Sequence, residues 1–269
     1  MKSDKYYSIL ALEKNKNIYI KSKELFVDFD SPGRIEFIQN DIEFLAKKKE
    51  NIYFWISGGG SYIVNNQYLM VVERGASSGV NPGQLSLFTG RSDSKEELEN
   101  PFLLTRELFE EVILTVDGDT VKPENREQQE IIDSVFKLFY KNKIVNEANL
   151  SRIAIEPFNL KTSKIKIKKN GNIKEFKCLY FINRNNDINV FFLFGININL
   201  NTFSAYDGEF HFSDDTRIFQ NRILYLYDFD RDEIINLNIE KRRDVVRLEN
   251  FTISENLNFI INILKNGNL

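Results

Sequence analysis

Three glutamates crowd onto one short stretch of this chain, the segment Arg106-Glu107-Leu108-Phe109-Glu110-Glu111. On a helix, residues three and four positions apart share a face, so Glu107, Glu110 and Glu111 point the same way. Neighbouring carboxylates repel one another, and a divalent cation turns that repulsion into coordination, because Mg²⁺ binds carboxylates and substrate phosphates through oxygen. The segment therefore indicates either a helix that holds a metal ion against a diphosphate or an amphipathic helix with a solvated acidic side.

The rest of the composition restricts the ligands that such a metal can have. The chain has one cysteine, Cys178, and one histidine, His211, which excludes a disulfide within the chain, a cysteine-based zinc cluster and a multi-histidine centre. Oxygen ligands favour Mg²⁺, Mn²⁺ or Ca²⁺ over zinc. The 36 basic and 39 acidic residues nearly balance, so global charge gives no argument for a nucleic acid as the main partner.

Length and hydrophobic content indicate a folded chain. The 269 residues suffice for one large domain or for one domain with a substantial elaboration. Hydrophobic residues make up 42 % of the chain, which supports a packed core. The N-terminus lacks the features of a signal peptide, and the longest apolar run, 190–196, is too short to span a bilayer as a helix. We therefore expect a cytoplasmic protein with no membrane partner.

The first half of the chain predicts short strands that lead to the acidic helix. In residues 1–50 we expect a helix over about 34–49, after short β runs at 18–20 and 25–29. Gly58 to Gly60 predict a tight turn or bulge, since the helix and the Gly-Lys-Ser/Thr of a phosphate loop are missing. Asn100 and Pro101 form a start signal for a helix that runs to roughly Leu114. Further β runs are expected at 52–56, 62–64, 68–72 and 84–88.

The second half predicts an insertion followed by closing elements. We expect a packing helix over 123–143 and a hairpin over 163–183 that turns at Asn170-Gly171. Three lysines alternate on the first hairpin strand, and they indicate either the solvated face of an edge strand or a basic stripe: Lys164, Lys166 and Lys168. The closing elements are a strand at 190–200, a strand at 223–229, a short helix from Asp230, and a helix from the cap Ser254 to the stop at Gly267.

Residues 52–116 together resemble the Nudix hydrolase family. Its sequence box is Gly, five residues, Glu, seven residues, then Arg-Glu-apolar-x-Glu-Glu-x-Gly-apolar. Gly90 and Glu96 satisfy the first spacing. The helical core is matched by Arg106, Glu107, Leu108, Glu110 and Glu111. Residues 85–90 resemble the strand in front of the box, with Phe88-Thr89 where Pro-Gly is usual, and 222–235 resemble the family's last strand and following short helix.

The chain departs from this box in two places. Nine residues rather than seven separate Glu96 from Arg106, so Glu97 and Glu99 are alternatives to Glu96 as the ion-pair partner of Arg106. Ile113 stands where the family has a glycine that serves backbone geometry, so we expect the helix to continue beyond its usual stop.

The resemblance implies an α+β fold, specifically a Nudix-like α/β/α sandwich with a mixed β-sheet. Residues 51–269 would form this domain, with a helix-plus-hairpin insertion at about 117–185. Residues 1–50 would form a β-rich N-terminal extension, which is a candidate element for a homodimer.

The resemblance also implies a Nudix-type pyrophosphohydrolase. Such an enzyme uses Mg²⁺ or Mn²⁺ to cleave a phosphoanhydride bond in a nucleoside diphosphate linked to another group, as in a nucleotide sugar, a dinucleotide or a nucleoside triphosphate. The family's metal ligands correspond to Glu107, Glu110, Glu111 and the backbone carbonyl of Gly90, and Arg106 would orient the glutamates.

Other groups of the site are expected around this helix. The general base would be a helix glutamate, Glu110 or Glu111, or alternatively Glu209 on a later loop. Arg74 and Arg91 are the candidates for binding the substrate. For Tyr62 and for Trp55 we expect core packing rather than stacking on a nucleobase, and for His211 a structural or surface role.

Two alternative hypotheses remain open. The first is a nucleotide-sensing or scaffolding protein with the same fold and no turnover, to which the altered box gives some weight and against which the three helix glutamates and Arg106 count. The second is an enzyme of the same family that acts on capped RNA 5′ ends, where the lysines of the 163–183 hairpin would assist binding.

Overall fold

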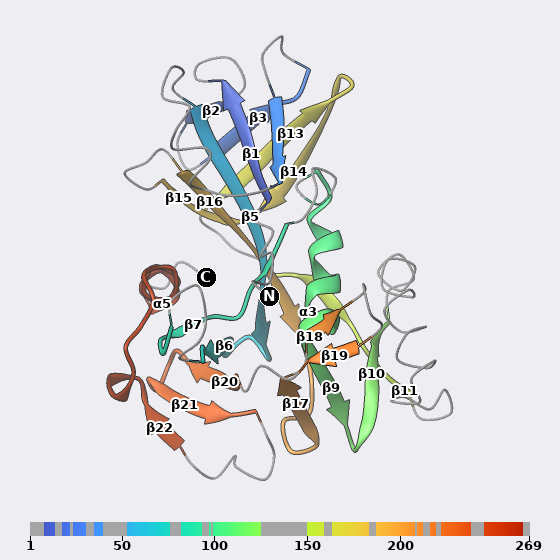
Figure 1. Cartoon of the computed structure of the whole chain (residues 1–269), viewed down its shortest axis with the longest axis vertical. Helices are drawn as coiled ribbons and strands as arrows, with labels where there is room; N and C mark the ends of the chain where they lie inside the picture. Colours follow the sequence, from blue (N-terminus) through green and yellow to red (C-terminus); the bar gives the residue numbers. More distant parts are fainter. Residues whose placement is uncertain are drawn as a thin grey trace.

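The structure of the chain, a computed structural model, describes residues 8–13, 18–21, 24–30, 35–39, 53–75, 82–92, 97, 99–124, 150–158, 163–182, 187–207, 209–211, 216–218, 222–237 and 245–265. These residues form an α+β fold in which strands dominate, as Figure 1 shows. Within these ranges, no helix is long and apolar enough to cross a membrane.

A mixed sheet forms the centre of the fold. Its main path has the order β12 (Ile155–Pro157), β16 (Asp187–Ile196), β5 (Tyr53–Val64), β6 (Tyr68–Glu73), β20 (Ile223–Asp228), β21 (Glu233–Asn236) and β22 (Val245–Arg247). Strands β16 and β5 are parallel, and the other neighbours on this path are antiparallel. The strands that join beside this path are β1 (Ser8–Glu13), β4 (Ile35–Gln39), β7 (Leu85–Leu87), β8 (Gly90–Arg91) and β15 (Leu179–Ile182).

Helices cover both faces of this central sheet. Successive side chains of a strand point to opposite faces, and alternate residues here belong to two separate cores. One core contains Tyr62, Val64, Met70, Val72, Leu224 and Leu226, and the 3₁₀ helix η1 (Pro101–Thr105) and helix α3 (Arg106–Glu111) pack on it through Leu104 and Leu108. The other contains Ile63, Leu69, Val71, Tyr225 and Tyr227, together with the apolar side of helix α5 (Glu255–Lys265).

Helix α3 ends earlier than the sequence predicts. The expected helix begins at Pro101 as predicted, but its first five residues form η1 and its last turn ends at Glu111. The prediction that the helix continues past its usual stop is wrong, because the run from Val112 is rich in β-branched residues and forms β9 (Val112–Val116). Strand β9 pairs with β10 (Asp119–Pro123) and β17 (Phe203–Asp207), and β11 (Leu150–Ile153) completes this sheet.

The glycine run lies within a strand rather than in the predicted turn or bulge. Gly58 to Gly60 are central residues of β5, which pairs there with β16 on one side and with β8 on the other. A Cβ on Gly59 would lie 2.5 Å from Thr89 Oγ1, and one on Gly60 would lie 3.2 Å from the Cβ of Leu104. The glycines therefore let the segment around Gly90 and the helix η1 lie close on the sheet.

Two of the N-terminal strands and the predicted hairpin form a separate sheet, with the order β14 (Asn172–Lys177), β13 (Lys164–Lys169), β3 (Glu24–Asp28) and β2 (Ile18–Lys21), at the top of Figure 1. The predicted hairpin turn is confirmed: Asn170 and Gly171 have φ angles of 52° and 75°. The second arm is shorter than predicted, since β15 leaves it and pairs with β16. The prediction of an edge strand is wrong, because β3 covers the free side of β13.

Two predicted helices are strands where the structure describes them. Residues 35–39 form β4, since β1 supplies an antiparallel partner, and 40–50 lie outside the described residues. The short helix expected from Asp230 is replaced by β21, because the Asp228 carboxylate accepts hydrogen bonds from the backbone N–H groups of Asp230 and Arg231 and closes a turn.

Most of the helix predicted over 123–143 cannot be compared with the structure, because 125–149 lie outside the described residues. Its first residue, Pro123, is the last residue of β10.

The C-terminal helix forms as predicted. The hydroxyl of Ser254 accepts a hydrogen bond from the backbone N–H of Leu257 at 3.4 Å and so caps α5. Its predicted apolar face is buried: Leu257, Ile260, Ile261 and Leu264. The 3₁₀ helix η3 (Leu248–Asn250) precedes it, and the predicted stop at Gly267 lies outside the described residues.

Candidate functional site

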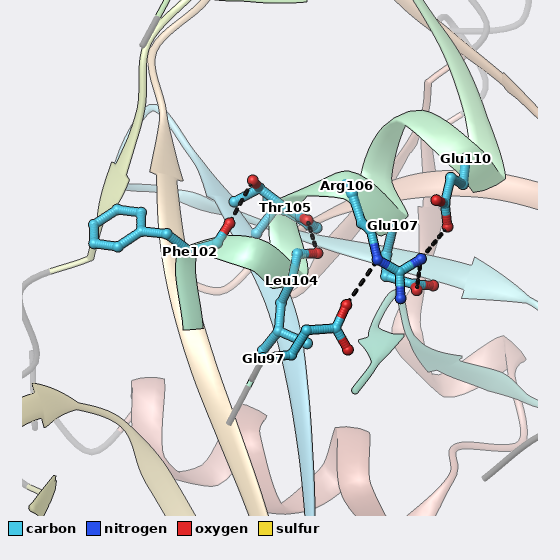
Figure 2. A network of polar contacts seen from close by, with 8 residues as sticks. Glu97, Phe102, Leu104, Thr105, Arg106, Glu107 and Glu110 are labelled. Atoms are coloured by element: carbon cyan, nitrogen blue, oxygen red, sulfur yellow. Dashed lines mark hydrogen bonds and ion pairs between the residues drawn. The ribbon is translucent and has the colours of Figure 1, made fainter. Parts of the chain in front are cut away.

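Three carboxylates surround Arg106, the first residue of α3 (Figure 2). Its Nε donates to Glu97 Oε1 at 2.7 Å, and its Nη1 lies 2.8 Å from Glu107 Oε1 and 2.5 Å from Glu110 Oε2. The Arg106 side chain is only 18 % exposed, so solvent and salt screen these pairs weakly. Burial alone would lower the pKa of Arg106, but the surrounding carboxylates outweigh burial and raise that pKa. The guanidinium therefore stays charged and fixes the geometry of the cluster.

The carboxylate that comes from the loop before the helix belongs to Glu97. Among the three glutamates considered for the ion pair with Arg106, Glu97 makes it and is 4 % exposed. Glu99 instead meets Lys169 at 2.5 Å, and Glu96 lies outside the described residues. The expectation that Glu97 could serve as an ion-pair partner of Arg106 is confirmed.

Gly90 lies directly against Glu107. A Cβ at position 90 would fall 2.0 Å from the Cβ and 2.2 Å from the Cγ of Glu107, which is sterically impossible without moving the helix. Gly90 belongs to β8 and pairs with Gly60 of β5, so its backbone is fixed to the central sheet. The absence of a side chain at this position therefore brings α3 onto the end of the strand and places the Glu107 side chain beside the Gly90 backbone.

Tyr62 packs beneath the contact between Gly90 and Glu107, as expected for a core residue. Its side chain is 0 % exposed, its hydroxyl donates to the carbonyl of Leu104 at 3.4 Å, and its ring lies 6.0 Å from that of Phe88. Burial, and then the charges of Glu107 and Glu111, raise the pKa of Tyr62 well above its usual value. Tyr62 is therefore a neutral support for the helix. The side chain of Trp55 lies outside the described residues.

Glu111 meets a second arginine, Arg222, which the sequence analysis missed. Arg222 Nη1 lies 3.2 Å from Glu111 Oε2, and Arg222 Nη2 donates to the main-chain carbonyl of Glu111 at 3.2 Å. The Arg222 side chain is 5 % exposed. The only signal in the sequence was a charge directly before the apolar run 223–229, and that position alone does not indicate a partner 111 residues away.

The structure describes the two candidate substrate-binding residues, Arg74 and Arg91, to different extents. Arg74 and Arg222 each lie one residue beyond the paired residues Glu73 and Ile223, so they share one end of the β6–β20 pair. Arg91 follows Gly90 in β8, but its side chain lies outside the described residues.

Glu209 begins β18 (Glu209–His211), which pairs with β19 (Thr216–Ile218) and lies beside α3 in Figure 1. The structure thus brings the backbone of Glu209 near the helix. The side chains of Glu209 and His211 lie outside the described residues.

The fit of these residues to a metal ion depends on their donor atoms. Within the part of the chain that the structure describes, no three Asp, Glu, His or Cys side chains form a group arranged to hold a metal ion. Glu107 and Glu110 contact Arg106, while Glu111 contacts Arg222. The donor types nevertheless suit Mg²⁺ or Mn²⁺, because carboxylate and main-chain carbonyl oxygens are the ligands that these ions prefer, and the Glu107 side chain lies beside Gly90.

No protein-family model matches this chain, and no curated protein matches its sequence. The function is therefore inferred from the residues of α3 and from the strands that hold them.

Proposed function

We propose that this protein is a Nudix-type pyrophosphohydrolase. It would use Mg²⁺ or Mn²⁺ to hydrolyse a phosphoanhydride bond in a nucleoside diphosphate linked to another group, such as a nucleotide sugar, a dinucleotide or a nucleoside triphosphate. The contact between Gly90 and Glu107 carries the proposal. The resemblance to the Nudix box implies that the strand and the helix meet there, and Arg106 beside this contact binds a loop glutamate, Glu97.

The arrangement of layers supports a Nudix-like α/β/α sandwich. A mixed sheet with one parallel pair, β16 and β5, lies between α3 on one face and α5 on the other. In this proposal residues 1–50 are an extension and about 117–185 an insertion.

The proposed roles follow from the donor atoms and charges. Glu107, Glu110, Glu111 and the carbonyl of Gly90 would hold the ion, which neutralises phosphate charge and makes bound water more acidic. Arg106 orients Glu107 and Glu110 through charge-assisted hydrogen bonds.

Other groups would handle the water and the phosphates. One helix glutamate, Glu110 or Glu111, or else Glu209, would accept the proton from the attacking water. Arg74 and Arg91 would bind the phosphates of the substrate.

A substrate screen with matched variants tests the proposal. Purified protein is given a nucleotide sugar, a dinucleotide and a nucleoside triphosphate, each with Mg²⁺ and with Mn²⁺. The double variant Glu110→Gln/Glu111→Gln is expected to lose more than about 100-fold in turnover, since loss of an outer partner of a metal site alone costs about 10–100-fold. The control Glu156→Gln changes an exposed glutamate of β12 and should keep full turnover. Undiminished hydrolysis by the double variant contradicts the metal assignment.

One observation favours the alternative of a nucleotide-sensing or scaffolding protein. Arg106 already pairs with Glu107 and Glu110, so part of the negative charge of the acidic cluster is neutralised without a metal ion. Isothermal titration of nucleotides with and without Mg²⁺ distinguishes the two functions. Tight binding without product formation would favour the sensor.

The hypothesis of an RNA substrate has weaker support. Lys164 and Lys166 contact Glu24 at 3.4 and 2.9 Å, and Lys168 contacts Asp28 at 3.3 Å. Acidic neighbours thus balance the charge of the predicted basic stripe. Strongly salt-dependent binding of capped RNA would support this hypothesis.

A further inference from the structure

Helix α3 ends without the residue that usually ends such a helix. The last carbonyl oxygens of a helix lack partners within it, and a glycine in the left-handed conformation commonly helps to satisfy them. Here Val112 follows the helix with φ −138° and ψ 153°, which is extended, and Ile113 stands in the β9 ladder opposite Tyr206. The chain turns directly from helix to strand, so no left-handed glycine ends α3.

Arg222 provides a donor at the end of α3. Its Nη2 donates to the main-chain carbonyl of Glu111, the last residue of α3, and its Nη1 lies equally close, at 3.2 Å, to the Oε2 of the same residue. A guanidinium presents several N–H groups in a rigid plane, so it can contact both oxygens at once, whereas a lysine ammonium is a flexible point charge.

The central sheet fixes the position of Arg222. The next residue, Ile223, pairs with Glu73 of β6, and Leu224 and Leu226 are buried in the core beneath α3. The Arg222 side chain is 5 % exposed, and such a buried charge requires a nearby carboxylate. Glu111 provides it while its own side chain is 24 % exposed, so the carboxylate keeps access to solvent.

We propose that Arg222 is a positioning residue that ends α3 in place of the usual glycine and fixes the orientation of the Glu111 carboxylate. The catalytic importance of that orientation rests on the proposed function, since it requires Glu111 to serve hydrolysis. The contact with the helix end does not rest on it. Arg222 thereby couples the edge of the central sheet to the helix that carries the glutamates.

A double-mutant cycle tests the structural half of this proposal without any substrate. The free energy of unfolding is measured in urea for wild type, Arg222→Gln, Glu111→Gln and the double variant. A coupling between the two sites is expected, because each residue contacts the other directly. Arg222→Lys keeps a cation at the site and serves where Arg222→Gln fails to fold. The control is Arg231→Gln, an exposed arginine in the turn that follows the other end of β20, which should show no coupling to Glu111.

Metal binding and turnover test the positioning half. Affinity for Mn²⁺ alone is measured by electron paramagnetic resonance, and kcat and KM are measured with whichever compound of the substrate screen is hydrolysed. Arg222→Lys is expected to retain most of the stability but to lower Mn²⁺ affinity or kcat by about 10–100-fold with little change in KM. Additive stabilities together with unchanged Mn²⁺ affinity would overturn the proposal. Coupling and weakened Mn²⁺ binding without hydrolysis by wild type would refute the proposed enzyme activity but keep the positioning role.

Discussion

The backbone of Gly90 lies so close to the side chain of Glu107 that no residue larger than glycine fits at position 90 without a shift of the helix. The two residues belong to different elements, β8 and α3, and their contact joins the end of a sheet strand to the acidic helix. The position of Glu107 therefore depends on a glycine in another part of the chain as much as on the helix that carries it.

Gly90→Ala is expected to destabilise the protein by about 1–3 kcal/mol, the usual range for overpacking a filled site. The added methyl would collide with the Cβ of Glu107, and α3 would have to move from the sheet. The matched control is Gly195→Ala in β16, where the nearest atom to a new Cβ is 3.7 Å away, an ordinary contact. Urea denaturation of both variants checks the prediction. Equal stabilities of the two variants would show that a side chain at position 90 is tolerated.

Arg106→Gln is expected to lower the free energy of unfolding by about 3 kcal/mol, since it leaves partly buried carboxylates without their counter-charge. Glu97, Glu107 and Glu110 all lose a partner within 2.8 Å. Arg247→Gln removes an arginine whose side chain is 78 % exposed and whose contact with Glu249 is 3.8 Å long, so it should change stability very little. Thermal or urea unfolding compares the two variants, and similar losses would contradict a structural role of the cluster.

Local signals in the sequence predicted the elements that depend on few residues. The Asn170-Gly171 turn requires only two residues that adopt positive φ, and α5 requires only a cap at Ser254 and an apolar period. Elements that depend on distant partners were predicted less well. Gly58 to Gly60 form part of a strand because β16 and β8 flank them, and residues 35–39 form β4 because β1 pairs with them.

The same distinction applies to the candidate site. The resemblance to the box implied that Gly90, Arg106 and Glu107 would lie together, and the longer loop made Glu97 a candidate partner of Arg106, which it contacts. The contact between Arg222 and Glu111 joins residues 111 positions apart and has no local pattern. The pairing of β20 in the central sheet brings Arg222 to the end of α3.

Asp232 is expected to make stability depend on acidic pH. Hydrogen bonds from Lys265, at 2.8 Å, and from the hydroxyl of Tyr227, at 2.6 Å, lower the pKa of Asp232 below its ordinary value of 3.8. A lowered pKa in the folded state stabilises the protein above pH 3.8, and this contribution disappears as the pH falls through the lower, folded-state value. The side chain is 52 % exposed, so the effect should stay below about 1 kcal/mol.

Urea denaturation of wild type and Asp232→Asn between pH 2 and pH 7, as a rough working range, checks this prediction. The two proteins should differ near neutral pH and converge at the acidic end. Asp230→Asn is the control, since Asp230 is an exposed neighbour in the same turn. A difference that persists unchanged at the lowest pH would show that the effect of Asp232 does not come from its charge.

Lys169 is expected to couple the sheet formed by β14, β13, β3 and β2 to the loop that leads into η1 and α3. It is the last residue of β13, directly before the hairpin turn, and its ammonium lies 2.5 Å from Glu99 Oε2. The Asp30 carboxylate fixes the same turn, because it accepts hydrogen bonds from the backbone N–H groups of Asn170 at 2.6 Å and Gly171 at 2.8 Å. Lys169→Gln should therefore lower global stability by no more than about 1 kcal/mol, as expected for a partly exposed pair.

The larger effect of Lys169→Gln should be local. Amide hydrogen exchange of residues 99–105, which run from Glu99 to the residue before Arg106, is expected to become faster while exchange in α5 stays unchanged. Lys174→Gln is the matched control, because Lys174 is exposed on the neighbouring strand β14. Unchanged exchange in 99–105 would mean that the loop is held without the hairpin. Faster exchange there would show that the sheet containing β13 stabilises the segment that places Arg106 among its three glutamates.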